Sequence, residues 1–186
     1  LVENRKVENY VDMALYYARM DAVYKDYMIA ETNLQEVAQQ VLLQNKYYLI
    51  QSHVKAEVAC PDTVYSDKKW IAFILNQLIQ NSVKYGRSEG THIQIVTKKT
   101  KSGVLLRVKD DGIGIPKEEI PRIFEKGFTG TNGRNRERST GMGLYLCRKL
   151  CDKLNIEIRA ESAEGKGTEI ILMFPVSDYL TGYRET

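Results

Sequence analysis

The chain has 186 residues, 43% of them hydrophobic and 27% charged, which fits one domain with a short appendage. This composition is typical of a globular protein and excludes a disordered, collagen-like or coiled-coil chain. The net charge of +3, with both signs interspersed along the chain, predicts no nucleic acid partner. The longest apolar stretches, such as residues 170–174, are too short to span a membrane, and the polar start shows no signal peptide.

The first residue is Leu rather than Met, which predicts that the chain was excised from a longer protein. Its three cysteines, Cys60, Cys147 and Cys151, form no CxxC pair, which indicates a reducing compartment. Cys147 and Cys151 are four residues apart on a predicted helix. They are interpreted as buried packing thiols, with a metal-binding pair as the alternative.

Helical spacing of apolar residues predicts a first helix over residues 7–18, and residues 27–30 form a short predicted strand. Asn33 and Glu36 have the spacing of a capping box, which predicts a helix that ends near Lys46. The next part of the chain predicts a strand over 54–58, a turn at 61–62 and a helix capped at 66–67 that stops at Gly86. Two strands over 93–97 and 104–108, joined by a turn at 98–103, follow, and after them a short helix over 118–124 and a loop over 126–140. The chain is completed by a predicted helix over 143–154 and by strands over 156–160 and 168–174 joined by a turn at 164–167. This order predicts an α/β two-layer sandwich, a mixed sheet with helices on one face.

Polar side chains interrupt the predicted helix that stops at Gly86. Gln77, Asn81 and Tyr85 are four residues apart and therefore share one face. Buried amides need hydrogen-bond partners, so these residues form either a site or a solvated stripe.

The sequence Asp110-x-Gly112-x-Gly114 follows a predicted strand. Glycines at this spacing let the backbone approach a planar or phosphorylated ligand, and the carboxylate before them accepts a hydrogen bond from an amine. Ordinary turns have the same pattern. It is not a Rossmann fingerprint, because no third glycine opens a helix at the required position.

Two further glycine pairs lie near the C-terminus. Gly141 and Gly143 stand directly before a predicted helix, where free backbone N–H groups bind anions, although a hinge with an N-cap has the same pattern. Gly165 and Gly167 are, by themselves, typical of a hairpin turn.

Together and in this order, these features resemble the N, G1, G2 and G3 boxes of the ATP-binding domain of sensor histidine kinases. Phe124 and Phe128 resemble the F box of that family. The resemblance covers about residues 27–176. It implies the Bergerat ATP-binding fold, which is shared with gyrase, Hsp90 and MutL.

The resemblance also implies roles for individual residues. Asn81 would be the protein ligand of Mg²⁺, and Asp110 would accept the adenine amino group. The other implied nucleotide-binding residues are Lys84 near the phosphates, Tyr85 near the base, Gly112 and Gly114 where the base packs, Ile115, the phosphate-wrapping residues Thr140, Gly141, Met142, Gly143 and Leu144, and Thr168. Residues 126–140 would form the ATP lid, in which Arg134, Arg136 and Arg138 are either γ-phosphate contacts or solvated charges.

Asn81, Gln77 and Lys84 are the predicted catalytic residues. The position of Gln77 is a water-activating Glu in hydrolytic members of the superfamily. An amide accepts no proton at neutral pH, so the resemblance implies a transferase that holds ATP for another nucleophile rather than an efficient ATPase.

That nucleophile in histidine kinases is a His on a dimerisation hairpin. His53 and His92 lack the motif that surrounds it. Residues 1–22 resemble the second helix of that hairpin, and residues 23–186 form the catalytic domain. The resemblance therefore implies a homodimeric two-component kinase that signals by phosphorelay to a response regulator. It implies a full-length protein in the bacterial membrane with this domain on the cytoplasmic side.

The tract Ala14 to Arg19 and the segment Asn76 to Tyr85 resemble the intramembrane-sensing kinases of Gram-positive bacteria, of the bacitracin-resistance type. Those kinases work beside ABC transporters. The alternatives are an ATP-gated binding module and a serine kinase of the anti-sigma type. An anti-sigma kinase would not begin with a hairpin-packing helix.

Overall fold

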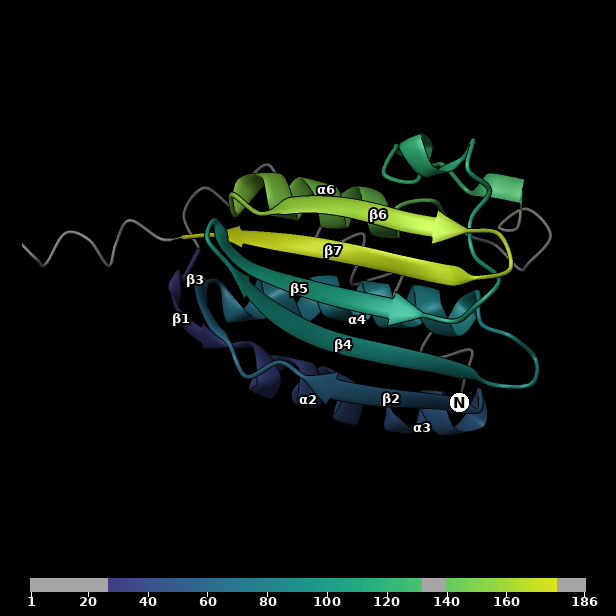
Figure 1. Cartoon of the computed structure of the whole chain (residues 1–186), viewed down its shortest axis with the longest axis horizontal. Coiled ribbons are helices and arrows are strands. Elements are labelled where there is room, and N and C mark those ends of the chain that lie inside the picture. The colour runs from purple at the N-terminus through teal and green to yellow at the C-terminus, as the bar shows by residue number, and fades with distance from the viewer. Residues whose placement is uncertain (1–26, 132–139, 177–186) are drawn as a thin grey trace, which may run out of the picture.

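The computed structural model describes residues 27–131 and 140–176 (Figure 1). Several predicted features lie outside these residues: the helix over residues 7–18, the hairpin segment 1–22 and the lid arginines Arg134, Arg136 and Arg138. Of the predicted lid, the described part is residues 126–131 and Thr140.

The main sheet has five strands in the order β2-β4-β5-β7-β6, where β2 and β4 are parallel and all other neighbours antiparallel. A separate antiparallel pair joins β1 to β3. The strands span Ala30–Asn33 (β1), Val54–Ala59 (β2), Thr63–Ser66 (β3), Thr91–Thr100 (β4), Gly103–Asp110 (β5), Glu157–Ala163 (β6) and Gly167–Pro175 (β7). The prediction of a mixed sheet is confirmed.

Helices cover one face of this sheet, as Figure 1 shows. They are α2 (Leu34–Gln44), α3 (Lys46–Gln51), α4 (Lys68–Lys84) and α6 (Gly143–Lys153), with a short 3₁₀ helix at Ile120–Arg122 between β5 and α6. Helix α4 lies between α2 and α6 and contacts β4 and β5. The predicted α/β two-layer sandwich is therefore confirmed.

Side-chain caps fix the start of two helices where the sequence predicts them. The Asn33 side chain accepts a hydrogen bond from the backbone N–H of Glu36 at 3.1 Å. The Asp67 carboxylate accepts from the N–H groups of Lys69 and Trp70, and its second oxygen accepts from the N–H of Met28 at 2.9 Å. Each cap satisfies N–H groups that have no partner inside the helix.

Some predicted boundaries are wrong. The first strand begins at Ala30 instead of ending there, because its pairing with β3 rather than local apolar character sets its position. The turn between β4 and β5 is shorter than predicted, since the ladder continues to Thr100 and Gly103. The predicted helix over 118–124 is a single 3₁₀ turn.

The core lies between the helices and the inner face of the sheet. Fully buried side chains of α4 meet those of the strands: Ile71, Ile74 and Leu75 on the helix, and Ile95, Leu106 and Leu172 on the sheet. Cys147 and Cys151 are buried in this core, and burial raises the pKa of both thiols, to about 12 for Cys151. They are packing thiols, as the sequence predicts.

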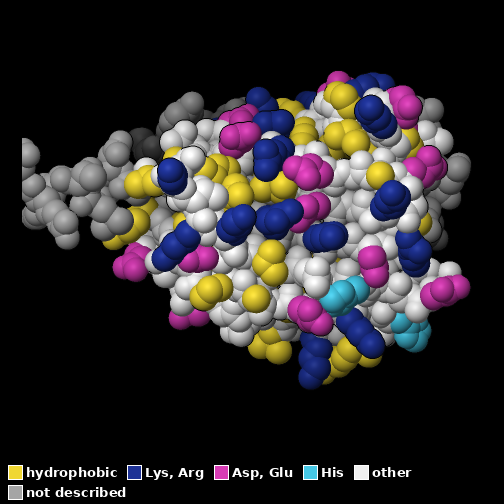
Figure 2. Space-filling model, in the orientation of Figure 1, with side chains coloured by type: hydrophobic (Ala, Val, Ile, Leu, Met, Phe, Trp, Pro, Cys, Tyr) yellow, Lys and Arg dark blue, Asp and Glu magenta, His cyan; other side chains and the backbone are white. Residues whose placement is uncertain are grey.

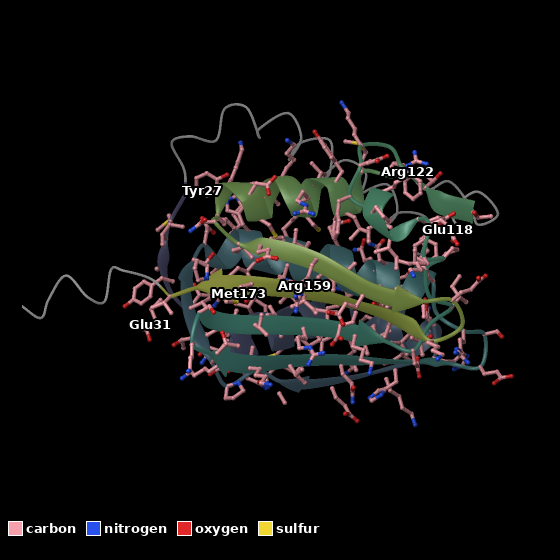
Figure 3. All side chains as sticks on the ribbon, turned by 45° about the horizontal axis from the view of Figure 1, so that its top comes forward. Tyr27, Glu31, Glu118, Arg122, Arg159 and Met173 are labelled. Carbon is pink, nitrogen blue, oxygen red and sulfur yellow. The ribbon has the colours of Figure 1, made fainter. Side chains whose placement is uncertain are left out.

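The opposite face of the sheet is polar, and Figure 2 shows basic and acidic side chains interspersed over it. The Arg107 guanidinium, for example, pairs with the Glu169 carboxylate at 2.8 Å. Figure 3 labels Arg159 on β6 and Met173 on β7. Among residues 27–131 and 140–176, no helix combines the length and apolar character needed to cross a lipid bilayer.

Candidate functional site

A cavity opens between α4, the ends of β5 and β7, and the segment that connects β5 to α6. Half of the predicted site residues line it: Asn81, Tyr85, Asp110, Gly114, Ile115, Leu144 and Thr168. The structure thus brings together residues from the predicted N, G1, G2 and G3 boxes, which are far apart in the sequence.

Asp110 is the polar centre of the cavity. One carboxylate oxygen, Oδ1, accepts hydrogen bonds from the N–H of Gly112 at 3.0 Å and of Thr168 at 3.1 Å. The other, Oδ2, accepts from the Ser82 hydroxyl at 2.8 Å. A carboxylate has about four acceptor positions. These three donors therefore leave capacity for one further donor from the cavity.

Burial raises the pKa of the Asp110 carboxyl above its ordinary value, because the charged form loses solvation. The hydrogen bonds from Ser82, Gly112 and Thr168 act in the opposite direction by stabilising the charge. A half-buried carboxylate with spare acceptor capacity gains from a ligand that donates to it.

Apolar side chains form the walls around this carboxylate. Val108 and Ile170 stand opposite each other on β5 and β7, and both face the cavity. The other apolar walls include Leu78 from α4, Ile115, Pro116, Ile123, Phe128 and Leu144. A flat apolar ring with an amino group on its edge fits such walls and such an acceptor.

The predicted residues of α4 separate into two groups. Asn81 and Tyr85 line the cavity, whereas Gln77 and Lys84 do not. Gln77 is buried, and its Oε1 lies 2.9 Å from the position that a Cβ would have at Gly143. The Lys84 ammonium lies 5.4 Å from the centre of the Tyr85 ring.

Gly112 and Gly114 are needed for close backbone packing within the protein. Gly114 has a φ of +71°, and a Cβ there would lie 2.0 Å from the carbonyl oxygen of Ala163. A Cβ at Gly112 would lie 2.6 Å from the carbonyl oxygen of Tyr85. The structure therefore adds a reason for these glycines that the sequence did not indicate, while the approach of a base to them stays a prediction.

None of residues 140–143 lines the cavity, and Gly141 lies against Gly127. The N–H of Gly127 donates to the carbonyl of Gly141, and the Thr140 hydroxyl accepts from the N–H of Met142. A Cβ at Gly141 would collide with the backbone of Gly127. Among residues 27–131 and 140–176, no side chain caps the start of α6.

Several cavity residues were missed in the sequence. Glu119 lines the cavity, and its Oε1 accepts from the N–H of Thr131 at 2.8 Å and from the hydroxyl of the same residue. The Arg122 guanidinium lies 4.6 Å from the centre of the Phe128 ring. The other lining residues that were not predicted individually as site residues are Leu78, Ser82, Val108, Pro116, Ile123, Phe128, Thr129, Gly130 and Ile170. The F-box resemblance of Phe124 and Phe128 and the predicted lid over residues 126–140 indicated this side of the cavity, without assigning roles to its lining residues.

The described residues contain no group of three or more His, Cys, Asp or Glu side chains that could hold a metal ion. Mg²⁺ is commonly bound through one or two protein oxygens, with water and phosphate oxygens as its other ligands. The Asn81 side chain at the cavity fits that mode of binding and no all-protein metal site.

The fold and the cavity define a two-layer sandwich of a class that suits a nucleotide: a mixed sheet, helices on one face, and a half-buried carboxylate in an apolar cavity between the layers. Residues 66–178 match the model of a family described as histidine kinase-, DNA gyrase B- and HSP90-like ATPase. The match covers more than half of the chain. The chain therefore belongs to this ATP-binding family.

Curated relatives share this domain. The chain is 34% identical over 174 residues to the sensor histidine kinase YxdK of Bacillus subtilis, a match that covers 92% of this chain and 54% of YxdK. It is 36% identical over 183 residues to the sensor protein kinase GraS of Staphylococcus aureus, covering 96% of this chain and 51% of GraS. The chain thus spans about half the length of these relatives.

Solved structures confirm the fold. The catalytic domain of the histidine kinase ThkA superposes with a TM-score of 0.68 at 26% identity, covering 80% of this chain and 97% of that one. A complex of ThkA with the response regulator protein TrrA matches with a TM-score of 0.70 at 23% identity, covering 95% of this chain and 49% of that one. The predicted relation to sensor histidine kinases is confirmed.

Proposed function

We propose that this chain binds Mg-ATP and donates the γ-phosphate to a histidine on a dimerisation hairpin, as the catalytic domain of a two-component sensor kinase. The single observation that supports ATP as the ligand is Asp110, a half-buried carboxylate with spare acceptor capacity inside apolar walls. Family membership supports the reaction class.

Adenine fits this cavity chemically. Its exocyclic amino group would donate to the Asp110 carboxylate, while its ring lies against Val108, Ile170 and Leu78. Guanine presents a carbonyl oxygen at the same position, and two acceptors facing each other repel. The site would therefore select adenine over guanine.

The described cavity has a volume of about 110 Å³, well below the roughly 300–1,000 Å³ of a complete small-molecule site. A base fits it, so the phosphates would extend beyond it, past Asn81. The Asn81 amide oxygen would bind Mg²⁺ together with phosphate oxygens. The N-terminus of α6, which no side chain of the described residues caps, and the Lys84 ammonium would supply further positive charge to the phosphates.

Phosphoryl transfer fits the described residues better than hydrolysis. The Gln77 side chain is an amide, which cannot take a proton from water, and it is buried beneath Gly143. Catalysis by this chain would then consist of holding and orienting the γ-phosphate and neutralising its charge. The attacking nitrogen would come from the hairpin histidine.

The relatives support the wider assignment to a membrane sensor kinase. YxdK and GraS are named as sensor kinases, and ThkA was solved in complex with a response regulator. We propose the bacitracin-resistance type of sensor: a homodimer in the bacterial membrane with this domain in the cytoplasm, a response regulator as the receiver, and an ABC transporter as a partner. The predicted division into residues 1–22 and 23–186 belongs to this proposal.

Replacing Asn81 tests the nucleotide and metal site. Asn81→Ala should abolish the increase in ATP affinity that Mg²⁺ causes, measured by calorimetric titration with and without the ion. Gln94→Ala is the matched control, because it removes an amide from the exposed side of β4, away from the cavity. Unchanged Mg²⁺ dependence in Asn81→Ala would contradict the metal assignment.

Radiolabelled ATP tests which group accepts the γ-phosphate. Incubation with the separately supplied hairpin should label the hairpin histidine, and acid should remove the label because a phosphoramidate is acid-labile. The chain alone should stay unlabelled. Acid-stable label on the chain itself would favour the serine-kinase alternative. Hydrolysis faster than about one turnover per second would favour an ATPase.

A further inference from the structure

The loop Asp110–Ile115 runs between two other parts of the chain. On one side lies the end of α4, where the carbonyl of Tyr85 accepts a hydrogen bond from the N–H of Ile113. On the other side lies the β6–β7 turn, where the N–H of Gly165 donates to the carbonyl of Ile113. The loop therefore connects the position of the β6–β7 turn to that of the end of α4.

Arg87 joins the loop and the turn through its guanidinium. Its Nε donates to the carbonyl oxygen of Asp111 at 2.8 Å, and its Nη2 donates to the carbonyl oxygen of Gly165. The backbone N–H of Arg87 donates to the Thr91 hydroxyl at 2.8 Å, which holds the residue at the end of α4. One planar group therefore bridges two carbonyls that are 54 residues apart in the sequence, a geometry that the fork of Arg suits.

The two bridged segments are the same ones that hold the Asp110 carboxylate. Asp111 directly follows Asp110, and Gly165 lies three residues before Thr168, whose N–H donates to Asp110 Oδ1. The packing between them is tight, since a Cβ at Gly167 would lie 2.0 Å from the carbonyl oxygen of Asp110. A small movement of the turn would move the donor at Thr168 and turn the carboxylate.

We infer that Arg87 is a positioning residue for base selectivity: its guanidinium fixes the loop and the turn so that the Asp110 carboxylate keeps its free acceptor position toward the cavity. The inference rests on the proposed binding of ATP at this site. Arg87 itself does not line the cavity, so it acts through Asp110 and not through the ligand.

The test compares ATP with inosine triphosphate, which has a carbonyl oxygen where ATP has the amino group. Calorimetric titration gives the ratio of the two affinities for the wild-type chain, Arg87→Ala, Arg87→Lys and Arg87→Gln. Arg159→Ala is the control, because Arg159 is exposed on β6 and its guanidinium lies 3.8 Å from Glu161, outside the cavity.

The wild-type chain should prefer ATP by about tenfold or more, the lower limit for one charge-assisted hydrogen bond. Arg87→Ala and Arg87→Gln should reduce this ratio about three- to tenfold. Arg87→Lys should restore little of it, because a single ammonium does not reproduce the planar fork. Arg159→Ala should keep the wild-type ratio.

Two other results would overturn the inference. Equal weakening of both nucleotides in Arg87→Ala, with an unchanged ratio, would mean that Arg87 only stabilises the fold. An unchanged ratio in all three Arg87 variants, with affinities as in the wild type, would mean that the bridge does not affect binding. A wild-type chain that binds ATP and inosine triphosphate equally would instead contradict the proposed adenine site, and the two failures are therefore distinguishable.

Discussion

The two sides of the cavity differ in how they are built. The strand side, formed by Val108, Asp110, Thr168 and Ile170, belongs to β5 and β7 and the ends of their ladder. The loop side, formed by Glu119, Ile123, Phe128, Thr129 and Gly130, belongs to the segment between β5 and α6. Figure 3 labels Glu118 and Arg122 on this segment.

Different interactions hold these two sides. Backbone pairing and part-buried hydrogen bonds fix the strand side, where Ser82 and Thr168 orient Asp110. Side-chain contacts at or near the surface fix the loop side: Glu119 to Thr131, and Arg122 over Phe128. Buried, mutually dependent contacts lose more when one member is removed than exposed pairs do. The strand side should therefore be sensitive to single substitutions and the loop side tolerant.

The largest expected effect is at Gly114, directly after β5, where the loop packs against the end of β6. Gly114→Ala should lower the free energy of unfolding by roughly 2–5 kcal/mol, because it adds left-handed strain and a clash with the carbonyl of Ala163. Gly165→Ala is the matched control: it has a φ of +74° but open space around a Cβ, so it should lose only about 1–2 kcal/mol. Urea denaturation measures both. Equal losses would show that strain alone, and not close packing, makes glycine necessary at position 114.

Asp110→Asn should weaken ATP binding about ten- to a hundredfold while the fold is kept. The amide oxygen can still accept from Gly112 and Thr168, but the side chain no longer offers a charged acceptor to the adenine amino group. Asp111→Asn is the control, since Asp111 is exposed and its side chain does not line the cavity. Calorimetry with both variants measures the difference, and similar losses in the two would contradict adenine recognition by Asp110.

The raised pKa of Asp110 predicts opposite pH effects on binding and on stability. The ionised carboxylate is a stronger acceptor for the adenine amino group than the protonated carboxyl, so ATP affinity should rise as pH increases through its folded-state pKa. A raised pKa means that ionisation costs folding free energy, so the contribution of Asp110 to stability should fall over the same window, above about pH 3.9. The difference between the wild type and Asp110→Asn across pH isolates both trends: calorimetric titration gives the trend in ATP affinity, and urea denaturation gives the trend in the free energy of unfolding. If ATP affinity and the contribution of Asp110 to stability changed in the same direction with pH, the assignment of Asp110 to adenine recognition would be contradicted.

The smallest effect is expected on the loop side. Arg122→Ala removes the guanidinium over the Phe128 ring, an exposed cation–π contact worth about 0.5–1 kcal/mol. ATP affinity should fall by no more than about fivefold, with Arg122→Lys closer to the wild type. A loss as large as that of Asp110→Asn would show that the two sides are equally sensitive.

The sequence predicted the fold well where local signals exist. The caps at Asn33 and Asp67 and the long apolar faces of α4 and α6 placed these helices to within a few residues. The short β3 was missed, because four residues are too few for a periodic pattern and its position depends on pairing with β1. A local sequence pattern carries no information about pairing between strands that lie far apart in the sequence.

The site was predicted in part for the same reason. Motif spacing placed Asp110, Asn81 and Thr168 at the cavity, but it did not place Gln77 beneath Gly143. Glu119 and Arg87 were not predicted at all, since their contacts join segments that no motif links. The close backbone contacts at Gly112 and Gly114 likewise become visible only when the strands are paired.

The parallel pairing of β2 with β4 has a consequence for folding kinetics. Hairpins β4–β5 and β6–β7 close over short turns, whereas β2 reaches β4 only after α4 has crossed the sheet. Local contacts form early and distant ones late, so we expect the hairpins to precede the docking of α4. Asp110 lies on the β4–β5 hairpin and Asn81 on α4, so the two residues come together only when α4 docks. A bound nucleotide should therefore slow unfolding far more than it speeds refolding.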